Sequence, residues 1–216
     1  MSFSNYLFSQ TAEKKDTKHW YETISMRGYF QFRYNRLFET NPNLKCEQCD
    51  KSWGDGGGFS IRRGRLVFSG NLTDRIYFYI QPDFASSTGT TLQLLQIRDA
   101  YLDMGFDKKN EFRVRLGQSK VPYGFENMQS SQNRLPMDRS DAINSGAPNE
   151  RDMGAFFYYA PAHIRTLFAS LTKDNLKGSG DYGVFGIGLY NGQSANKPEL
   201  NNSLHIASRL SYPFEP

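Results

Sequence analysis

Long hydrophobic runs are absent from this 216-residue chain, and so are the residue clusters that mark most active sites. No run approaches the roughly 18 apolar residues of a membrane-spanning helix. The three histidines, His19, His163 and His205, are scattered, and no serine, cysteine or carboxylate constellation surrounds any of them. The sequence therefore predicts neither a helical membrane protein nor an enzyme, and it indicates no cofactor.

Cysteine is equally scarce, with Cys46 and Cys49 forming a single CEQC motif. A zinc site would need two further ligands, and none lies at suitable spacing. A thioredoxin-like redox motif would need a βαβ context, which the surrounding pattern lacks. We therefore expect a loop disulfide or free thiols at this motif, and no metal.

A secretion leader is also not visible, because residues 1–10 have neither a basic region nor an apolar one. For a secreted or outer-membrane protein this is a departure. We expect either that the chain begins inside a longer reading frame or that a signal was removed. Residues 1–20 are polar and aperiodic, so they are expected to form a flexible lead-in.

What the chain does contain is alternation. It has 19 glycines, 17 phenylalanines and 15% aromatic residues at a mean hydropathy of -0.64, which favours an all-β protein. From residue 75 onward Ile76 and Phe78 share one face while Tyr77 and Tyr79 share the other, and this period of two indicates a strand. The same test predicts eight antiparallel strands, at 24–35, 58–69, 75–84, 96–106, 111–118, 153–159, 182–190 and 204–212. One short amphipathic helix is expected near 161–176.

The expected connections alternate in length. Long loops are predicted at 36–58, 86–95, 120–151 and 191–203, and short turns at 70–74 and 107–110. Long loops at one end and short turns at the other are typical of bacterial outer-membrane barrels, whose strands also alternate apolar and polar faces. The helix in the remaining connection departs from that pattern.

Assigning the apolar face outward places a set of arginines inside. They are Arg27, Arg33, Arg63, Arg65, Arg75, Arg113, Arg115 and Arg209. The strands oppose these with only Asp83, Asp99 and Asp103. A narrow lumen lined in this way would concentrate anions and repel cations. Arg62 falls on the outward parity, where it is expected to snorkel toward the membrane interface.

The same alternation also fits a soluble or surface-attached β-sandwich. Its basic face, with Tyr77, Tyr79 and Tyr101, would then bind acidic polymers such as single-stranded nucleic acid. The net charge of +4 is compatible with either hypothesis. Apolar faces on nearly every strand argue against the sandwich, because a sandwich of this size buries only one layer of them.

Several motifs, in order along the chain, resemble the phosphate-selective porin O/P family of Gram-negative outer membranes. They include MRGYFQFRY at 26–34, RVRLGQSKVPYGFE at 113–126 and NERDMGAFF at 149–157. The resemblance implies a sixteen-stranded transmembrane barrel, usually a homotrimer in outer-membrane lipid, that passes small anions such as phosphate and binds no nucleic acid. Residues 21–216 fit the N-terminal half of this pattern, so we expect a fragment with about eight of the strands.

By the same resemblance, residues 120–151 look like the loop that folds into the pore and narrows it. Lys120, Arg134 and Arg139 are its candidate anion contacts. Glu126, Asp138 and Asp141 are the opposing charges that would orient or pair with them.

Overall fold

One curved antiparallel sheet makes up most of the molecule. The computed structural model describes residues 20–36, 38, 41, 43, 57–88, 91–136, 138–140, 142–143, 150–176, 178–180 and 182–213. Eight strands follow each other in chain order, each hydrogen-bonded to the next. Their bounds are β1 Ile24–Arg36, β2 Gly57–Asn71, β3 Ile76–Thr88, β4 Thr91–Gly105, β5 Phe112–Lys120, β6 Arg151–Tyr159, β7 Phe185–Tyr190 and β8 His205–Leu210. The predicted all-β fold is confirmed.

Helical structure is limited to short pieces. A 3₁₀ turn, η1 (Trp20–Thr23), precedes β1, α1 (Phe125–Met128) lies after β5, and α3 (Ala162–Lys173) lies between β6 and β7. The last of these confirms the helix expected near 161–176. None of the helices in the described residues has the length and apolar character needed to cross a membrane.

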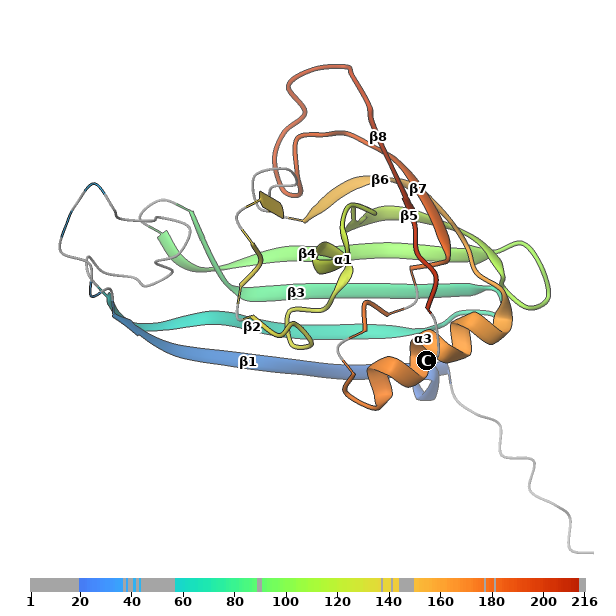
Figure 1. Cartoon of the computed structure of the whole chain (residues 1–216), viewed down its shortest axis with the longest axis horizontal. Helices are drawn as coiled ribbons and strands as arrows, with labels where there is room; N and C mark the ends of the chain where they lie inside the picture. Colours follow the sequence, from blue (N-terminus) through green and yellow to red (C-terminus); the bar gives the residue numbers. More distant parts are fainter. Residues whose placement is uncertain are drawn as a thin grey trace, which may run out of the picture.

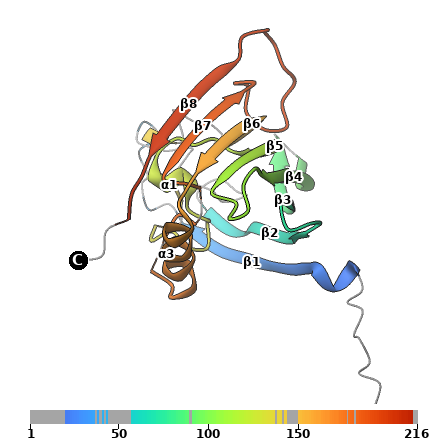
Figure 2. The same ribbon diagram turned by 90° about the vertical axis from the view of Figure 1, so that its right-hand side faces the viewer.

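The sheet curls about its strand direction. Figure 1 shows the long strands side by side, and Figure 2, at right angles to it, shows the sheet bending into an arc with β1 and β8 at its two edges. Helix α3 lies on the concave side of this arc. Because the described strands form one sheet, the alternative of two sheets packed as a sandwich is wrong for this part of the chain.

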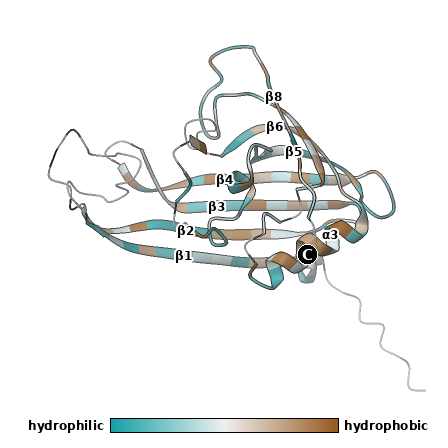
Figure 3. Cartoon of the chain, viewed as in Figure 1, coloured by the Kyte–Doolittle hydropathy of each residue, from teal (hydrophilic) through white to brown (hydrophobic). Residues whose placement is uncertain are grey.

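Polarity is reversed relative to a soluble protein. Large apolar side chains stand exposed on the outer face, including Phe30 (64%), Leu102 (43%) and Ile206 (69%). Charged side chains on the concave face are buried, with Arg63 and Arg115 each 3% exposed. Figure 3 shows the alternation of hydrophobic and hydrophilic residues along the long strands. Such an arrangement suits an apolar solvent outside the sheet and a polar interior.

Polar side chains close the short turns and so fix the strand register. In the β2–β3 turn, the hydroxyl of Thr73 accepts hydrogen bonds from the backbone amides of Arg75 (3.2 Å) and Ile76 (3.1 Å). In the β4–β5 turn, the carboxylate of Asp107 accepts from the amides of Lys109 (2.9 Å) and Phe112 (3.0 Å). These bonds are the local reason for the tight turns that the sequence predicts at this end of the sheet.

Register shifts interrupt the alternation, and two of them each leave an arginine as an extra residue. Between β1 and β2, Gln31 pairs with Arg63 but Phe32 pairs with Ile61, which leaves Arg62 as an extra residue. Between β3 and β4, Gln81 pairs with Asp99 but Pro82 pairs with Ile97, which leaves Arg98 as an extra residue in β4. A bulge changes which face the following side chains occupy. The expectation that Arg62 snorkels outward is therefore wrong, because its guanidinium contacts Asp138 of the loop at 3.0 Å.

Several predicted bounds also need correction. The loop expected at 86–95 is largely strand, since β3 continues to Thr88 and β4 begins at Thr91, with these two residues paired. At the other extreme, β7 and β8 are shorter than the alternation suggests. The predicted strand at 182–190 starts three residues before β7, and the predicted strand at 204–212 extends past β8 at both ends. Residues 1–19 and the CEQC motif lie outside the described residues.

Candidate functional site

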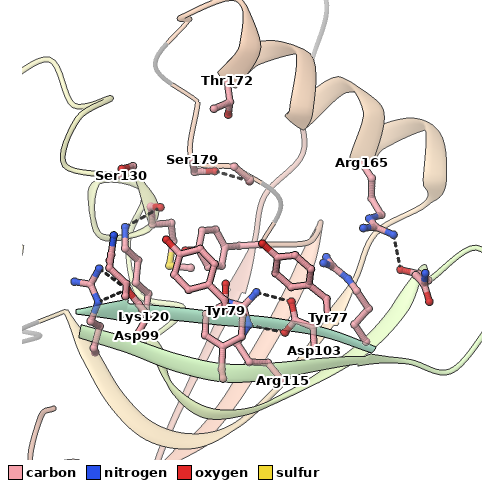
Figure 4. Close-up of a pocket in the computed structure, with 18 of the residues that line it drawn as sticks. Tyr77, Tyr79, Asp99, Asp103, Arg115, Lys120, Ser130, Arg165, Thr172 and Ser179 are labelled. Atoms are coloured by element: carbon pink, nitrogen blue, oxygen red, sulfur yellow. Dashed lines mark hydrogen bonds and ion pairs between the residues drawn. The ribbon is translucent and has the colours of Figure 1, made fainter. Parts of the chain in front are cut away.

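A cavity of about 400 Å³ lies on the concave face. Its floor is formed by β3 and β4, and its other walls come from the loop after β5 and the connection that carries α3 (Figure 4). Eight cationic side chains line it, namely Arg27, Arg65, Arg75, Arg113, Arg115, Lys120, Arg151 and Arg165. The carboxylates that line it are Asp74, Asp99 and Asp103. The cavity is therefore positively charged overall.

Tyrosine rings form much of the cavity floor. Tyr79 of β3 stacks on Tyr101 of β4 with ring centroids 5.1 Å apart. The guanidinium of Arg115 lies 3.7 Å above the ring of Tyr101, and it donates to both carboxylate oxygens of Asp103 at 2.7 and 2.8 Å. A two-pronged bond to the carboxylate, combined with stacking, holds a guanidinium rigidly in place. Arg115 is thus a fixed part of the wall.

Within the residues that the structure describes, four of the eight predicted lumen arginines pair with carboxylates. Arg33 and Arg63 contact Asp138, Arg65 contacts Asp83 at 2.7 Å, and Arg115 contacts Asp103. These carboxylates offset positive charge of the arginines that the alternation pattern places in the lumen.

The other four differ in their surroundings. Within the described part of the chain, no carboxylate pairs with Arg27, Arg75 or Arg209. Arg27 lies 5.9 Å from the ring of Tyr79, Arg75 is exposed, and Arg209 donates to the hydroxyl of Ser211 at 3.1 Å. Arg113 is buried at the cavity wall. Of these side chains, Arg27 and Arg75 line the cavity without a described carboxylate partner, so both contribute to its positive excess.

The carboxylate of Asp138 is one attachment of the loop after β5 to the wall. Asp138 accepts from Arg33 at 2.6 Å, from Arg62 at 3.0 Å and from Arg63 at 3.0 Å. Burial alone would raise the pKa of Asp138, but the bond from Arg33 and the three positive charges outweigh it and lower that pKa to about 2. The carboxyl group is therefore charged at every physiological pH.

A second carboxylate, Glu150, holds the base of the loop. It lies 3.0 Å from both Arg134 and Arg139 and 2.8 Å from Arg151. Burial opposes its ionisation, but the charges of Arg151, Lys120 and the two loop arginines keep the pKa of Glu150 well below its ordinary value. Arg151 also reaches Asp99 in β4 at 2.9 Å, so this network ties the loop to the sheet.

The three predicted loop cations therefore all have structural partners. Lys120 donates to the backbone carbonyls of Met128 and Gln129, and Arg139 donates to the side-chain carbonyl of Asn127 as well as contacting Glu150. Among the predicted opposing charges, Glu126 accepts from the amide and hydroxyl of Ser140, and Asp141 lies outside the described residues. A role for the loop cations as anion contacts stays a prediction.

Sequence reasoning missed three arginines of the inner face. Arg62 and Arg98 lie at the two bulges, and a strict period of two assigns both of them outward. Arg98 instead contacts Asp83 at 3.4 Å. Arg151 is the first residue of β6, where the loop joins the strand. The predicted strand begins only at residue 153, so the alternation pattern does not assign Arg151 to either face. The one available signal was chemical, because an arginine on a lipid face is costly.

Comparison with known proteins places this arrangement in a family. A family model described as phosphate-selective porin O and P matches residues 44–215. Comparison with curated protein sequences gave no match. The family match covers most of the chain, and it agrees with the antiparallel sheet, the apolar outer face and the polar inner face described above. The chain therefore belongs to the phosphate-selective porin O and P family, a family of bacterial outer-membrane porins.

Proposed function

We propose that the concave face of this sheet lines a passive, anion-preferring diffusion channel, and that the chain carries out no catalysis. The observation that carries the proposal is the excess of cationic over acidic side chains around the cavity. In a narrow passage with walls of low dielectric constant, such an excess attracts anions and repels cations over the whole cross-section. Small oxyanions such as phosphate suit arginine, whose planar fork of donors matches their oxygens.

The loop between β5 and β6 serves in this proposal as the constriction. It packs on the concave face through Asp138 and Glu150, and it contributes Ser130, Ser131 and Asn133 to the cavity. Because its own arginines are held by Glu150, the loop narrows the passage mainly by its bulk. The wall arginines then supply most of the attraction for the solute. By its family, the assembled porin is proposed to be a homotrimer in outer-membrane lipid.

Reversal potentials in planar bilayers test this function. The full-length porin, with a potassium chloride gradient across the membrane, should pass chloride in preference to potassium. Arg27→Gln and Arg75→Gln are the informative variants, because both side chains line the cavity and neither would leave a described carboxylate unpaired. Each should lower the ratio of anion to cation permeability by roughly two-fold, through the loss of one charge from a focused field.

Lys197→Gln is the matched control, since Lys197 is an exposed cation on the connection between β7 and β8. It should leave the permeability ratio unchanged. A channel that prefers cations would overturn the arginine argument, and a full-length protein that gives no conductance would overturn the channel itself. Phosphate added to the chloride solution should lower the chloride current if oxyanions occupy the same passage.

A further inference from the structure

The connection between β6 and β7 is longer than its strands require. Tyr159 at the end of β6 pairs with Phe185 at the start of β7, so a tight turn would suffice to join them. The other connections at this end, 72–75 and 106–111, are of that short kind. The connection instead contains α3 and the described residues 174–176, 178–180 and 182–184 that follow it. We call these described residues, with α3, the α3 segment.

The α3 segment is fixed against the sheet end rather than left in solvent. Arg165 donates to the backbone carbonyls of Lys109 (3.2 Å) and Asn110 (2.9 Å) in the β4–β5 turn. The amide of Ala162 donates to the carboxylate of Glu111 at 2.9 Å. Ile164 and Phe168 are buried, each at 5% exposure or less. These contacts attach the helix to the short-turn end of the sheet, and Figure 2 shows it on the concave side.

The end of the segment reaches the interior wall. The ring of Tyr182 meets Tyr158 of β6 edge-on with centroids 6.1 Å apart, and the guanidinium of Arg115 lies 5.3 Å from it. Thr172 and Ser179 line the same cavity from the side opposite Tyr77 and Tyr79 (Figure 4). The cavity therefore lies between this segment and the sheet, with the loop after β5 at its other side.

We propose that the α3 segment forms a second narrowing of the channel at its short-turn end, which selects small anions by size after they pass the loop. A solute crossing the concave face would meet the loop first and the α3 segment second, with the tyrosine-floored cavity between them. This inference rests on the proposed channel function. It assigns to α3 a role in permeation rather than the capping of a sheet edge.

Replacing residues 161–183 with a two-residue Asn-Gly turn tests the proposal in the full-length porin. The single-channel chloride conductance should rise by roughly two-fold, because a passage with one of two narrowings removed has a lower resistance. The permeability of the larger anion gluconate relative to chloride should rise as well. As a control, removal of residues 197–202, which are exposed on the long connection after β7, should change neither value.

A thiol-labelling experiment keeps the proposal testable if the shortened variant folds poorly. In a background with Cys46 and Cys49 replaced by serine, modification of Thr172→Cys by a charged thiol reagent should lower the conductance of the intact-length channel. Modification of Lys108→Cys, in the exposed β4–β5 turn, should not. Unchanged conductance after complete modification of Thr172→Cys would overturn the second narrowing.

A readout without current separates this inference from the channel function. In detergent, Tyr77→Cys at the cavity floor should react with the reagent several-fold faster when residues 161–183 are replaced than when they are present. Equal rates would show that the segment does not cover the cavity, and the inference would fail whether or not the protein conducts. If the wild-type protein does not conduct, but the labelling rates with and without residues 161–183 differ, the channel function would be wrong. The position of the α3 segment over the cavity would still be supported.

Discussion

A single carboxylate, Asp138, joins the inserted loop to three arginines of the wall. Replacing it with asparagine keeps the shape of the side chain and removes its charge. Arg33 and Arg63, both buried, would then lose the negative charge of Asp138 beside them. We expect Asp138→Asn to lower the free energy of unfolding by about 1–3 kcal/mol, because buried charges lose their partner. It should also increase open-channel current noise, since the loop loses one of its attachments to the wall.

Thermal unfolding in detergent and single-channel recording measure these two effects. Glu199→Gln is the matched control, because Glu199 is exposed and accepts a bond only from the nearby amide of Asn201 among the described residues. That variant should behave like the wild type. An Asp138→Asn protein as stable and as quiet as the wild type would show that the contact does not hold the loop.

The stabilisation that Asp138 provides should also depend on pH, and it should weaken in acid. The pKa of Asp138 is about 2 in the folded protein against an ordinary 3.8. Because the folded value is the lower one, the contribution to stability is complete above about pH 4 and is lost as the pH falls toward 2. The difference in melting temperature between wild type and Asp138→Asn should be constant from neutral pH to about pH 4 and shrink below it. A difference that grows in acid would contradict this assignment.

At the scale of elements, a bulge decides the face on which Arg62 lies. Alternation puts Arg62 with the lipid-facing residues, whereas the register shift in β2 turns it toward Asp138. In the cysteine-free background, Arg62→Cys should therefore react with a charged, water-soluble thiol reagent from the lumen side. Met26→Cys, on the exposed outer face of β1, should react only with a lipid-soluble reagent. The opposite selectivity at Arg62→Cys would restore the simple alternation.

A glycine in β5 marks another place where the strand departs from regular geometry. Gly117 has a φ of 123°, and a Cβ there would lie 2.3 Å from the backbone oxygen of Ala100. We expect Gly117→Ala to lower the free energy of unfolding by about 1–3 kcal/mol, through strain and a clash with backbone. Gly64→Ala is the control, because its Cβ would meet only side-chain atoms at 3.7 Å or more. Equal melting temperatures for the two variants would contradict the argument.

The strands, turns and helix could be predicted from the sequence because each depends mainly on residues close together in the chain. A period of two in Ile76–Ile80, turn chemistry at Thr73 and Asp107, and the 3.6-residue spacing of Ile164 and Phe168 predict the strands, turns and helix. The bulges at Arg62 and Arg98 could not be predicted in the same way, because the register between two strands depends on both. The long loop at 120–151 was predicted, but its contacts with the wall were not, since they join residues up to 105 positions apart in the sequence.

At the scale of the whole molecule, the sequence predicted which side of the sheet carries the candidate site. It did not predict how far carboxylates offset the positive charge of the arginines there. Alternation alone put Arg63, Arg65 and Arg115 on the concave side, where the structure has them. The sequence could not show that carboxylates from neighbouring strands and from the loop pair with them. The pairs of Arg65 with Asp83 and of Arg115 with Asp103 depend on the register between two strands, and the pair of Arg63 with Asp138 depends on the folded loop. The anion preference that we propose is thus a property of the folded chain, and it cannot be obtained by counting arginines.

The central claim is that bilayer lipid contacts the apolar face of the sheet while water and anions contact the other. Two positions on β3 test it most directly, the outward Ile80 and the cavity-lining Tyr77, each replaced by cysteine and labelled with a fluorophore. In reconstituted vesicles, brominated lipid chains should quench the label at 80 and not at 77, and aqueous iodide should quench the label at 77 and not at 80. The reverse result would put the arginines in hydrocarbon, and there would be no channel along this face.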